Sequence, residues 1–421
     1  MKAMNSVTSP QPFPSLLGKV GDEGLWQPLA FMMAALLSLA IPAGLMGRPA
    51  PRDQRVQQID AFLSGLISER EPGAAVLVVK DGRVVFERGY GVTDLRTGRR
   101  IDARTNFRLA SVTKQFTAAA VMLLVRDGKL RYEDRLTDIF PDFPEYGRAI
   151  ALRHLLNHTS GLPDYEDLMP PADPALPIEQ VQIRDAGVLD LLKLQKSAKF
   201  EPGTRWAYSN SGYVLLGLVV EKVSGRTFAG FLQERIFVPL KMTGTVACEH
   251  GKISVSNRAF GHSKEGVNWN ETDQSPTSAT LGDGGIYSSL SDLMKWDEAL
   301  RRHTLLTEAD MRAGLTPVRV PEGLPTDPTG PAGSRAEYGF GWFLNPWQGH
   351  ARMWHYGDTA GFRTVIQRFT GDGLTVVVLC NRTDLDAPGL ALKAAGLFLE
   401  GAQLPVWSGR AGPGKVGSGC H

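Results

Sequence analysis

The chain has few cysteines and almost no excess of either charge, and both features narrow its function. Its 421 residues include three cysteines, Cys248, Cys380 and Cys420, with no C-x-x-C spacing. This pattern supports neither a disulfide framework nor a cysteine-based metal or redox site. Lys and Arg total 46 against 44 Asp and Glu, which leaves a net charge of +2. Because no basic face is available to neutralise a run of phosphates, we expect no nucleic-acid partner.

Several catalytic and cofactor signatures are also missing. G-x-S-x-G is absent, which argues against the nucleophile elbow of ordinary α/β-hydrolases. The glycines between 282 and 285 fit neither a Walker nor a dinucleotide spacing. His154 and His158 lie four residues apart on a predicted helix, but no third ligand or H-E-x-x-H pattern accompanies them. We therefore expect no metal site and no cofactor.

The N-terminal region contains an apolar run that indicates a leader. Residues 29–46 are mainly apolar and uncharged, and Gly47-Arg48-Pro49 ends the run. It resembles the apolar region of a signal peptide, or a short membrane anchor broken by Pro42. We expect residues 1–52 to be leader and linker, and the protein to be exported to the periplasm or outside the cell. An uncleaved anchor is the alternative, and it would be the one contact with a membrane.

The remaining pattern predicts strands near both ends and helices between them. A helix over 55–67 precedes two β-rich runs, 74–79 and 84–86, joined by the hairpin dipeptide Asp81-Gly82. Helical patterns cover 111–125, 211–223 and 291–300; strands return at 338–344, 363–369 and 374–379, and a helix follows at 387–399. This order predicts a sheet domain, 53–106 plus 331–403, with a mainly helical domain, 107–330, inserted in it. The Gly-rich tail, 404–421, is predicted to be disordered.

Ser111-Val112-Thr113-Lys114 is the one S-x-x-K tetrad in the chain. It stands where the helical pattern begins, so Ser111 and Lys114 fall one turn apart on the same face. A hydroxyl there lies at the positive end of a helix dipole, beside an amine that can take its proton. Ser111 is therefore the candidate nucleophile.

Tyr208-Ser209-Asn210 is the one Y-x-N sequence, on a loop before a predicted helix. Alternate residues of an extended loop face the same way, so Tyr208 and Asn210 can enter one cleft together. The phenol could relay a proton and the amide could donate to a substrate carbonyl. Taken alone, the same residues also fit a helix cap.

His355-Tyr356-Gly357 precedes a β-rich run. A glycine here would let a substrate backbone approach a strand edge. Taken alone, His355 also fits a buried, hydrogen-bonded structural histidine.

In the order S-x-x-K, Y-x-N, H-x-G, these three elements resemble the serine β-lactamase and penicillin-binding-protein superfamily, in its class C-like branch. The phrases Leu155 to Leu162 and Gly282 to Ser289 also look like that branch. The resemblance covers residues 74–399 and implies an α/β fold whose antiparallel sheet is flanked by helices. Class C β-lactamases usually carry K-T-G as the third element, whereas H-Y-G is similar to certain D-alanyl-D-alanine carboxypeptidases, D-aminopeptidases and related esterases.

The resemblance also implies a role for each site residue. Ser111 would attack a carbonyl while Lys114 and Tyr208 move its proton, and Tyr208 would serve as the base when water releases the acyl group. The oxyanion hole would be formed by the backbone amides of Ser111 and Asp358. Asn210 would hold the acyl side chain, Gly357 would admit the substrate, and His355 would orient the Tyr208 hydroxyl or a substrate carboxylate.

Three functions remain open at this point. The first is a hydrolase of ester, amide or β-lactam carbonyls, and the second is a D-stereospecific peptidase. The third, a scaffold that reuses the fold, would have no reason to retain the nucleophile and its partners together. In either enzymatic case the partner is a small molecule or short peptide.

Overall fold

The computed structural model describes residues 53–249, 253–324, 326–327, 329 and 334–404. Residues 52–421 form one compact unit. The predicted leader and nearly all of the predicted disordered tail lie outside the described residues. Within the part of the chain that is described, no helix is both long and apolar enough to cross a bilayer.

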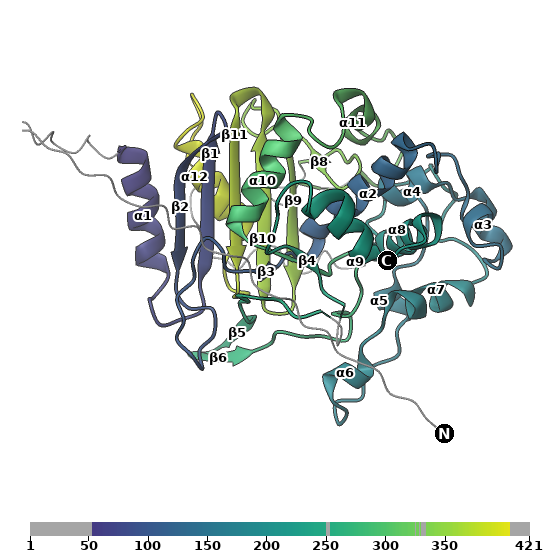
Figure 1. Ribbon diagram of the computed structural model, residues 1–421, viewed down its shortest axis with the longest axis horizontal. Helices are drawn as coiled ribbons and strands as arrows, with labels where there is room; N and C mark the ends of the chain where they lie inside the picture. Colours follow the sequence, from purple (N-terminus) through teal and green to yellow (C-terminus); the bar gives the residue numbers. More distant parts are fainter. Residues whose placement is uncertain (1–52, 250–252, 325, 328, 330–333, 405–421) are drawn as a thin grey trace, which may run out of the picture. The chain divides into compact units, whose positions relative to one another are not determined.

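A six-stranded antiparallel sheet is built from the two ends of this unit (Figure 1). The strand order is β2-β1-β11-β10-β9-β8. The strands are β1 (Ala74–Lys80), β2 (Arg83–Tyr90), β8 (Phe343–Leu344), β9 (Arg352–Thr359), β10 (Phe362–Phe369) and β11 (Leu374–Cys380). Strand β1 pairs with β11, so segments about 300 residues apart in the sequence lie side by side in the sheet. This arrangement confirms the predicted fold class.

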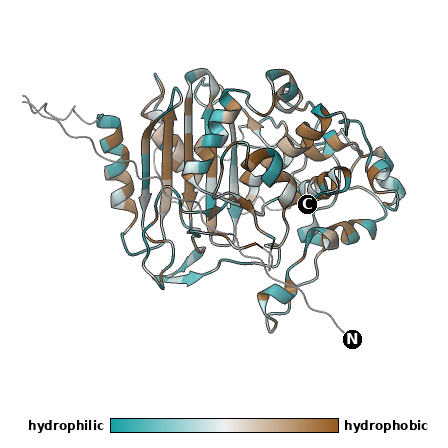
Figure 2. Ribbon diagram, in the orientation of Figure 1, coloured by the Kyte–Doolittle hydropathy of each residue, from teal (hydrophilic) through white to brown (hydrophobic). Residues whose placement is uncertain are grey.

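Both faces of the sheet are buried. Along β1, Val76 and Val78 pack into one core with α1 (Gln54–Leu66) and α12 (Ala387–Gly396). The alternate residues of the strand, among them Leu77, pack into a second core with the central helices. Strands β1 and β11, which are buried along both faces, read as nearly continuous apolar runs and are mainly brown in Figure 2.

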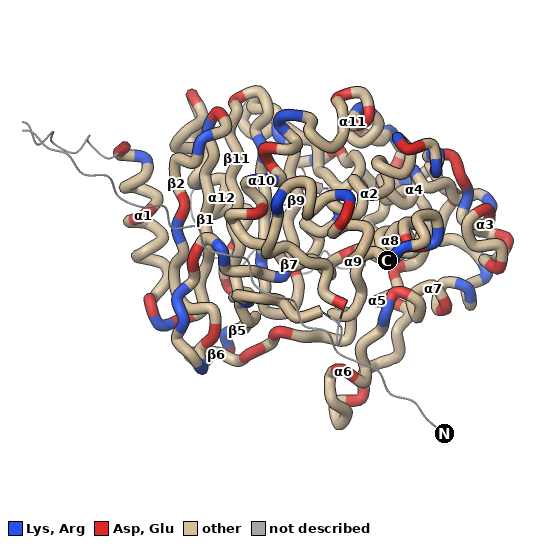
Figure 3. Tube along the Cα trace, in the orientation of Figure 1, with Lys and Arg blue, Asp and Glu red and all other residues tan. Residues whose placement is uncertain are grey.

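The segment between the two halves of the sheet is mainly helical. Its helices are α2 (Lys114–Arg126), α3 (Leu136–Ile139), α4 (Leu152–Leu156), α5 (Tyr165–Leu168), α6 (Ile178–Val181), α7 (Asp185–Lys193), α8 (Asn210–Ser224), α9 (Phe228–Leu232), α10 (Leu290–Arg301) and α11 (Glu308–Leu315). It also holds a three-stranded sheet of β3 (Phe107–Arg108), β7 (Ile286–Ser288) and β4 (Val246–Ala247), and a hairpin of β5 (His262–Glu265) and β6 (Asn268–Glu271). Charges of both signs are interspersed along these elements (Figure 3).

The local predictions hold best where short-range chemistry decides the structure. Asp81 and Gly82 adopt φ values of 53° and 75°, as the tight turn between β1 and β2 requires. The strand predicted over 338–344 is wrong for most of its length. Only Phe343–Leu344 pairs with β9, because the chain turns at Gly341, where φ is 76°. Strand β9 was not predicted, although it carries His355 and Gly357.

Candidate active site

Ser111 lies on a tight turn at the start of the longest predicted helix. The predicted α-helical start at Ser111 is instead a 3-10 turn, η1 (Ala110–Thr113), and α2 begins at Lys114. Ala110 directly before the serine has φ of 48° and is buried. A left-handed conformation costs a non-glycine residue about 1–2 kcal/mol, and such strain often occurs at functional sites. The strained turn fixes the direction in which the Ser111 side chain projects from the backbone.

The Lys114 ammonium group joins three parts of the chain. Its Nζ donates to Ser111 Oγ at 3.1 Å, to Asn210 Oδ1 at 2.9 Å and to the backbone oxygen of Asp283 at 3.0 Å. Of these three acceptors, the amide and backbone oxygens carry no proton, whereas the serine hydroxyl does. When Lys114 is neutral, its lone pair can therefore turn toward Ser111 while two donated bonds persist. This geometry allows the neutral amine to accept the proton of the serine hydroxyl.

Burial tunes Lys114 for this role. The side chain is fully buried, which lowers the pKa of Lys114 to about 8. The carboxylates of Asp283, Asp164 and Glu166 act in the opposite direction and keep the pKa from falling further. An amine with a pKa of about 8 is close to the working range of a general base near neutral pH.

Tyr208 lies beside the nucleophile and the lysine. Its ring centroid is 4.9 Å from Lys114 Nζ, and its hydroxyl shares a side-chain hydrogen bond with Ser111. Burial raises the pKa of Tyr208 well above its usual value, although the bond to Ser111 acts in the opposite direction. The phenol therefore keeps its proton, which favours proton relay over action as a tyrosinate base.

His158, which sequence reasoning left without a role, supports the Tyr208 ring. The two ring centroids lie 4.3 Å apart, and His158 is buried at φ of 61°. Its Nδ1 accepts the backbone N–H of Ser209 at 3.2 Å. Burial holds the pKa of His158 well below its usual value, so the ring is neutral. The phrase Leu155 to Leu162 had signalled this segment, but no local pattern signals a ring contact with Tyr208.

Asn210 is the first residue of α8. The sequence Tyr208-Ser209-Asn210 forms a helix cap and also places Asn210 beside Lys114. Ser209 is the N-cap, since its side chain accepts from the backbone N–H of Gly212. Asn210 Nδ2 donates to Glu166 Oε1 at 3.3 Å, and its backbone N–H donates to Asp164 Oδ2 at 2.7 Å. The helix cap thus places the Asn210 amide between Lys114 and two carboxylates that sequence reasoning missed.

The loop of residues 282–285 also has a role that the motif search missed. The backbone oxygen of Asp283 accepts a hydrogen bond from Lys114 Nζ, and Thr117 Oγ1 donates to the backbone oxygen of Gly282 at 2.6 Å. A Cβ atom at Gly282 would lie 2.3 Å from the backbone oxygen of Tyr213 in α8. The loop therefore needs glycine where it passes between α2 and α8.

His355 differs from its expected role. It lies on β9 opposite Ile366, and it is only 1% exposed. Its Nδ1 bonds the Tyr356 backbone oxygen at 2.7 Å and its Nε2 bonds the Tyr338 hydroxyl at 3.0 Å. Both ring nitrogens are thus engaged by partners other than Tyr208, whose ring centroid is 6.4 Å away. Burial and the charge of Lys114 lower the pKa of His355 to about 3, so the ring is neutral above mildly acidic pH.

Gly357 brings β9 against the turn that carries the nucleophile. A Cβ atom there would lie 2.2 Å from the Leu109 oxygen and 3.0 Å from the Ala110 Cβ. Gly357 therefore does permit a close approach to the strand, but the group that approaches it is the backbone of this chain at Leu109 and not a substrate. Asp358, the next residue, pairs with Arg363 at 2.6 Å. The assignment of the Ser111 and Asp358 amides to an oxyanion hole stays a prediction. Among the described residues, no group of three or more His, Cys, Asp and Glu side chains could hold a metal ion.

Comparison with known proteins agrees with this geometry. The family described as Beta-lactamase matches residues 52–398. Penicillin-binding protein 4* of Bacillus subtilis is 31% identical over 84% of this chain and 78% of its own length. A D-aminopeptidase of Brucella anthropi is 31% identical over 74% of this chain, which spans 56% of that relative. The octameric penicillin-binding protein homologue from Pyrococcus abyssi is 26% identical, with a TM-score of 0.68 over 81% of this chain and 77% of that one.

Proposed function

The chain belongs to the serine β-lactamase and penicillin-binding-protein superfamily and is a serine hydrolase, and we propose that it cleaves ester, amide or β-lactam carbonyls through an acyl-enzyme on Ser111. The contact of Lys114 with Ser111 carries the proposal, because it pairs a nucleophile with a buried amine whose pKa is about 8. Such a pair is the requirement for nucleophilic catalysis by a serine hydroxyl.

In the proposed acylation, Lys114 takes the Ser111 proton as the serine oxygen bonds to the substrate carbonyl carbon. Negative charge then develops on the carbonyl oxygen, where backbone amides would stabilise it. The bond to the leaving group breaks, and Tyr208 passes a proton to that group and recovers one from the lysine. Water then attacks the acyl carbon while Lys114 takes its proton; the bond from that carbon to the serine oxygen breaks, and Lys114 returns the proton to Ser111 Oγ as the acid product leaves. Because the pKa of Tyr208 is raised, we assign the base in both halves to Lys114 and the relay to Tyr208.

A second candidate is the D-stereospecific peptidase or amidase, and one observation favours it. Glu166 accepts from the side-chain amide of Asn210, which is proposed to hold the acyl part of the substrate, and Asp164 accepts from the backbone N–H of the same residue. A free ammonium group on that part could form a charge-assisted hydrogen bond with Glu166. The relative from Brucella anthropi is named as a D-aminopeptidase.

A substrate panel separates the two candidates. The specificity constant would be compared for a chromogenic cephalosporin, a short-chain aryl ester, a D-alanine amide with a free amine and its N-acetylated form. A D-aminopeptidase favours the free amine, and Glu166→Gln should reduce that preference by at least about tenfold, the scale of a lost charged hydrogen bond. Asp167→Asn is the matched control, since Asp167 pairs with Lys199 instead of contacting Asn210. Native protein without a preference for the free amine would reject this candidate and leave the general hydrolase intact, whereas an equal preference in native protein and Glu166→Gln would reject the role of Glu166.

We also propose that the protein is exported, on the basis of the apolar run at residues 29–46. N-terminal sequencing of the product from its native host would test this proposal. A new N-terminus between residues 46 and 56 would support a cleaved leader, whereas a full-length cytoplasmic product would contradict export without affecting the catalytic assignment.

A further inference from the structure

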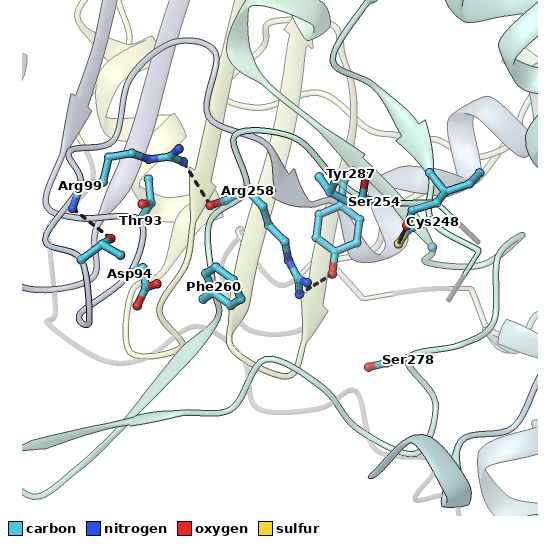
Figure 4. Close-up of a pocket in the computed structure, with 13 residues that line it drawn as sticks. Thr93, Asp94, Arg99, Cys248, Ser254, Arg258, Phe260, Ser278 and Tyr287 are labelled. Atoms are coloured by element: carbon cyan, nitrogen blue, oxygen red, sulfur yellow. Dashed lines mark hydrogen bonds between the residues drawn. The ribbon is translucent and has the colours of Figure 1, made fainter. Parts of the chain in front are cut away.

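A cavity of about 500 Å³ is lined by residues other than those of the candidate active site. Its lining includes Arg99, Arg258, Cys248, Ser278 and Tyr287, and none of Ser111, Lys114, Tyr208, Asn210 or His355. Figure 4 shows the labelled side chains around it, with Arg258 extending toward Tyr287. The polar groups come from several segments of the chain, which is typical of a ligand site.

Arg108 is not itself part of the lining, but it contacts residues that are. Arg108 is directly opposite Tyr287 in the β3 and β7 pair. Residues directly opposite in an antiparallel pair project from the same face, so Arg108 points to the side on which Tyr287 lines the cavity. Arg108 Nη2 donates to the backbone oxygen of Ser278, another lining residue, at 2.9 Å. Its charge also acts on the Cys248 thiol.

Arg108 is a buried charge without a carboxylate partner among the described residues. It is 3% exposed, and its hydrogen-bond acceptors are the backbone oxygens of Ser278 and Gly284. Its Nη1 is buried and has no hydrogen-bond partner within the described part of the chain. A buried charge is costly unless an opposite charge and hydrogen bonds compensate it. The residue therefore leaves an uncompensated positive charge beside the cavity, which a ligand of opposite charge would offset.

The other charges of the lining leave the cavity basic. Arg258 pairs with Asp273 and donates to the Tyr287 hydroxyl at 3.1 Å, but its buried Nε has no partner among the described residues. Asp94, the acidic residue of the lining, is paired with Arg96. Arg99 adds a positive charge and donates to the Arg258 backbone oxygen at 3.3 Å. The lining thus carries the guanidinium groups of Arg99 and Arg258 against the carboxylate of Asp94.

We infer that this cavity binds a small oxyanion, either a carboxylate or a phosphate group, whose charge compensates Arg108. Arginine N–H groups match the planar oxygens of a carboxylate and the oxygens of a phosphate. The Ser278 and Cys248 side chains also line the cavity. Its volume of about 500 Å³ limits the size of the ligand. This inference concerns a site apart from the proposed chemistry and does not depend on it.

Thermal unfolding tests the inference directly. Full-length protein would be titrated with potassium phosphate or potassium acetate, each compared with potassium chloride at equal ionic strength. A ligand that binds the folded state raises Tm with increasing concentration. We expect a concentration-dependent rise with at least one oxyanion beyond that seen with chloride. A response to phosphate alone would identify a phosphate-type ligand, and a response to acetate a carboxylate-type ligand.

Arg108→Met should separate charge from packing. Without an oxyanion, its Tm should equal or exceed that of the native protein, because an uncompensated buried charge has been removed. Its apparent affinity for the oxyanion should fall by at least about tenfold. Arg99→Gln, a surface change at the cavity, should also weaken binding and carries the test if Arg108→Met does not fold. Arg100→Gln, next in the chain and absent from the lining, is the matched control.

Labelling of Cys248 provides a second readout. The oxyanion should slow alkylation of Cys248 by N-ethylmaleimide in the native protein and in Arg100→Gln, but not in Arg108→Met or, should that variant not fold, in Arg99→Gln. Cys380 is buried and serves as an internal reference in the same peptide digest. The inference is wrong if neither oxyanion raises Tm more than chloride, or if Arg108→Met and Arg99→Gln respond as the native protein does.

Discussion

Lys114 Nζ lies 3.1 Å from Ser111 Oγ, and the serine is the one of its three hydrogen-bond acceptors that carries a proton. Only the neutral amine can accept that proton. Because the pKa of Lys114 is about 8, the specificity constant should rise with pH through about 8 and then level off. Below the midpoint the rate should fall about tenfold per pH unit. A pH profile on a neutral aryl ester measures this, and a flat profile between pH 6 and 9 would contradict the role of Lys114.

Tyr208→Phe should affect substrates according to their leaving groups. A phenol that relays a proton matters most when the leaving group is a poor one, such as an amine. We expect a loss of at least about a hundredfold for an amide and a smaller loss for an activated aryl ester. The ratio of specificity constants for the two substrates is the measurement. An equal loss for both would mean that Tyr208 acts on the nucleophile alone.

His355 should have no titration in the range where the enzyme works. Its pKa is lowered to about 3, so the ring stays neutral between pH 5 and 9. His355→Gln should therefore leave the shape of the pH profile unchanged, even if it lowers the rate. A pH profile of His355→Gln whose midpoint differs from that of the native protein would contradict this assignment.

Replacing His355 by lysine should destabilise the protein instead of creating a carboxylate site. The new ammonium group would lie in a buried position beside the charge of Lys114. Thermal unfolding should show a lower Tm than for His355→Gln. A His355→Lys variant with native Tm and better use of carboxylate-bearing cephalosporins would instead restore the role first expected from the sequence.

Gly357→Ala should damage both stability and catalysis. A Cβ atom would lie 2.2 Å from the Leu109 oxygen, so β9 or the Ser111 turn must move. We expect a lower Tm and a lower kcat, because the displaced turn carries the nucleophile. Gly371→Ala is a matched control, since a Cβ atom there meets nothing within 4 Å. Equal Tm and kcat values for the two variants would show that the contact with Leu109 tolerates a methyl group.

The parts of this molecule that the sequence predicts are those decided by local chemistry. The S-x-x-K spacing places Ser111 and Lys114 together because one helical turn separates them, and Asp81-Gly82 makes its hairpin turn. Strand β9 was missed because His355, Gly357 and Asp358 interrupt its β-rich pattern, and its pairing with β10 depends on tertiary structure.

The supporting partners of the site could not be predicted in the same way. His158 meets the Tyr208 ring, and Tyr338 meets His355, only because separate segments pack together. The carbonyl oxygen of Asp283 is a backbone group, so no side-chain motif can reveal that it accepts from Lys114. The resemblance to a known family identified these segments but did not identify their contacts.

The most direct test of the account is mass spectrometry of the protein after reaction with a penicillin or a fluorophosphonate. Peptide mapping should place a single adduct on Ser111 in the native protein and none in Ser111→Ala, with hydrolysis of all substrates lost in that variant. An adduct on another serine, such as Ser160 or Ser209, or continued labelling of Ser111→Ala, would contradict the assignment of the nucleophile.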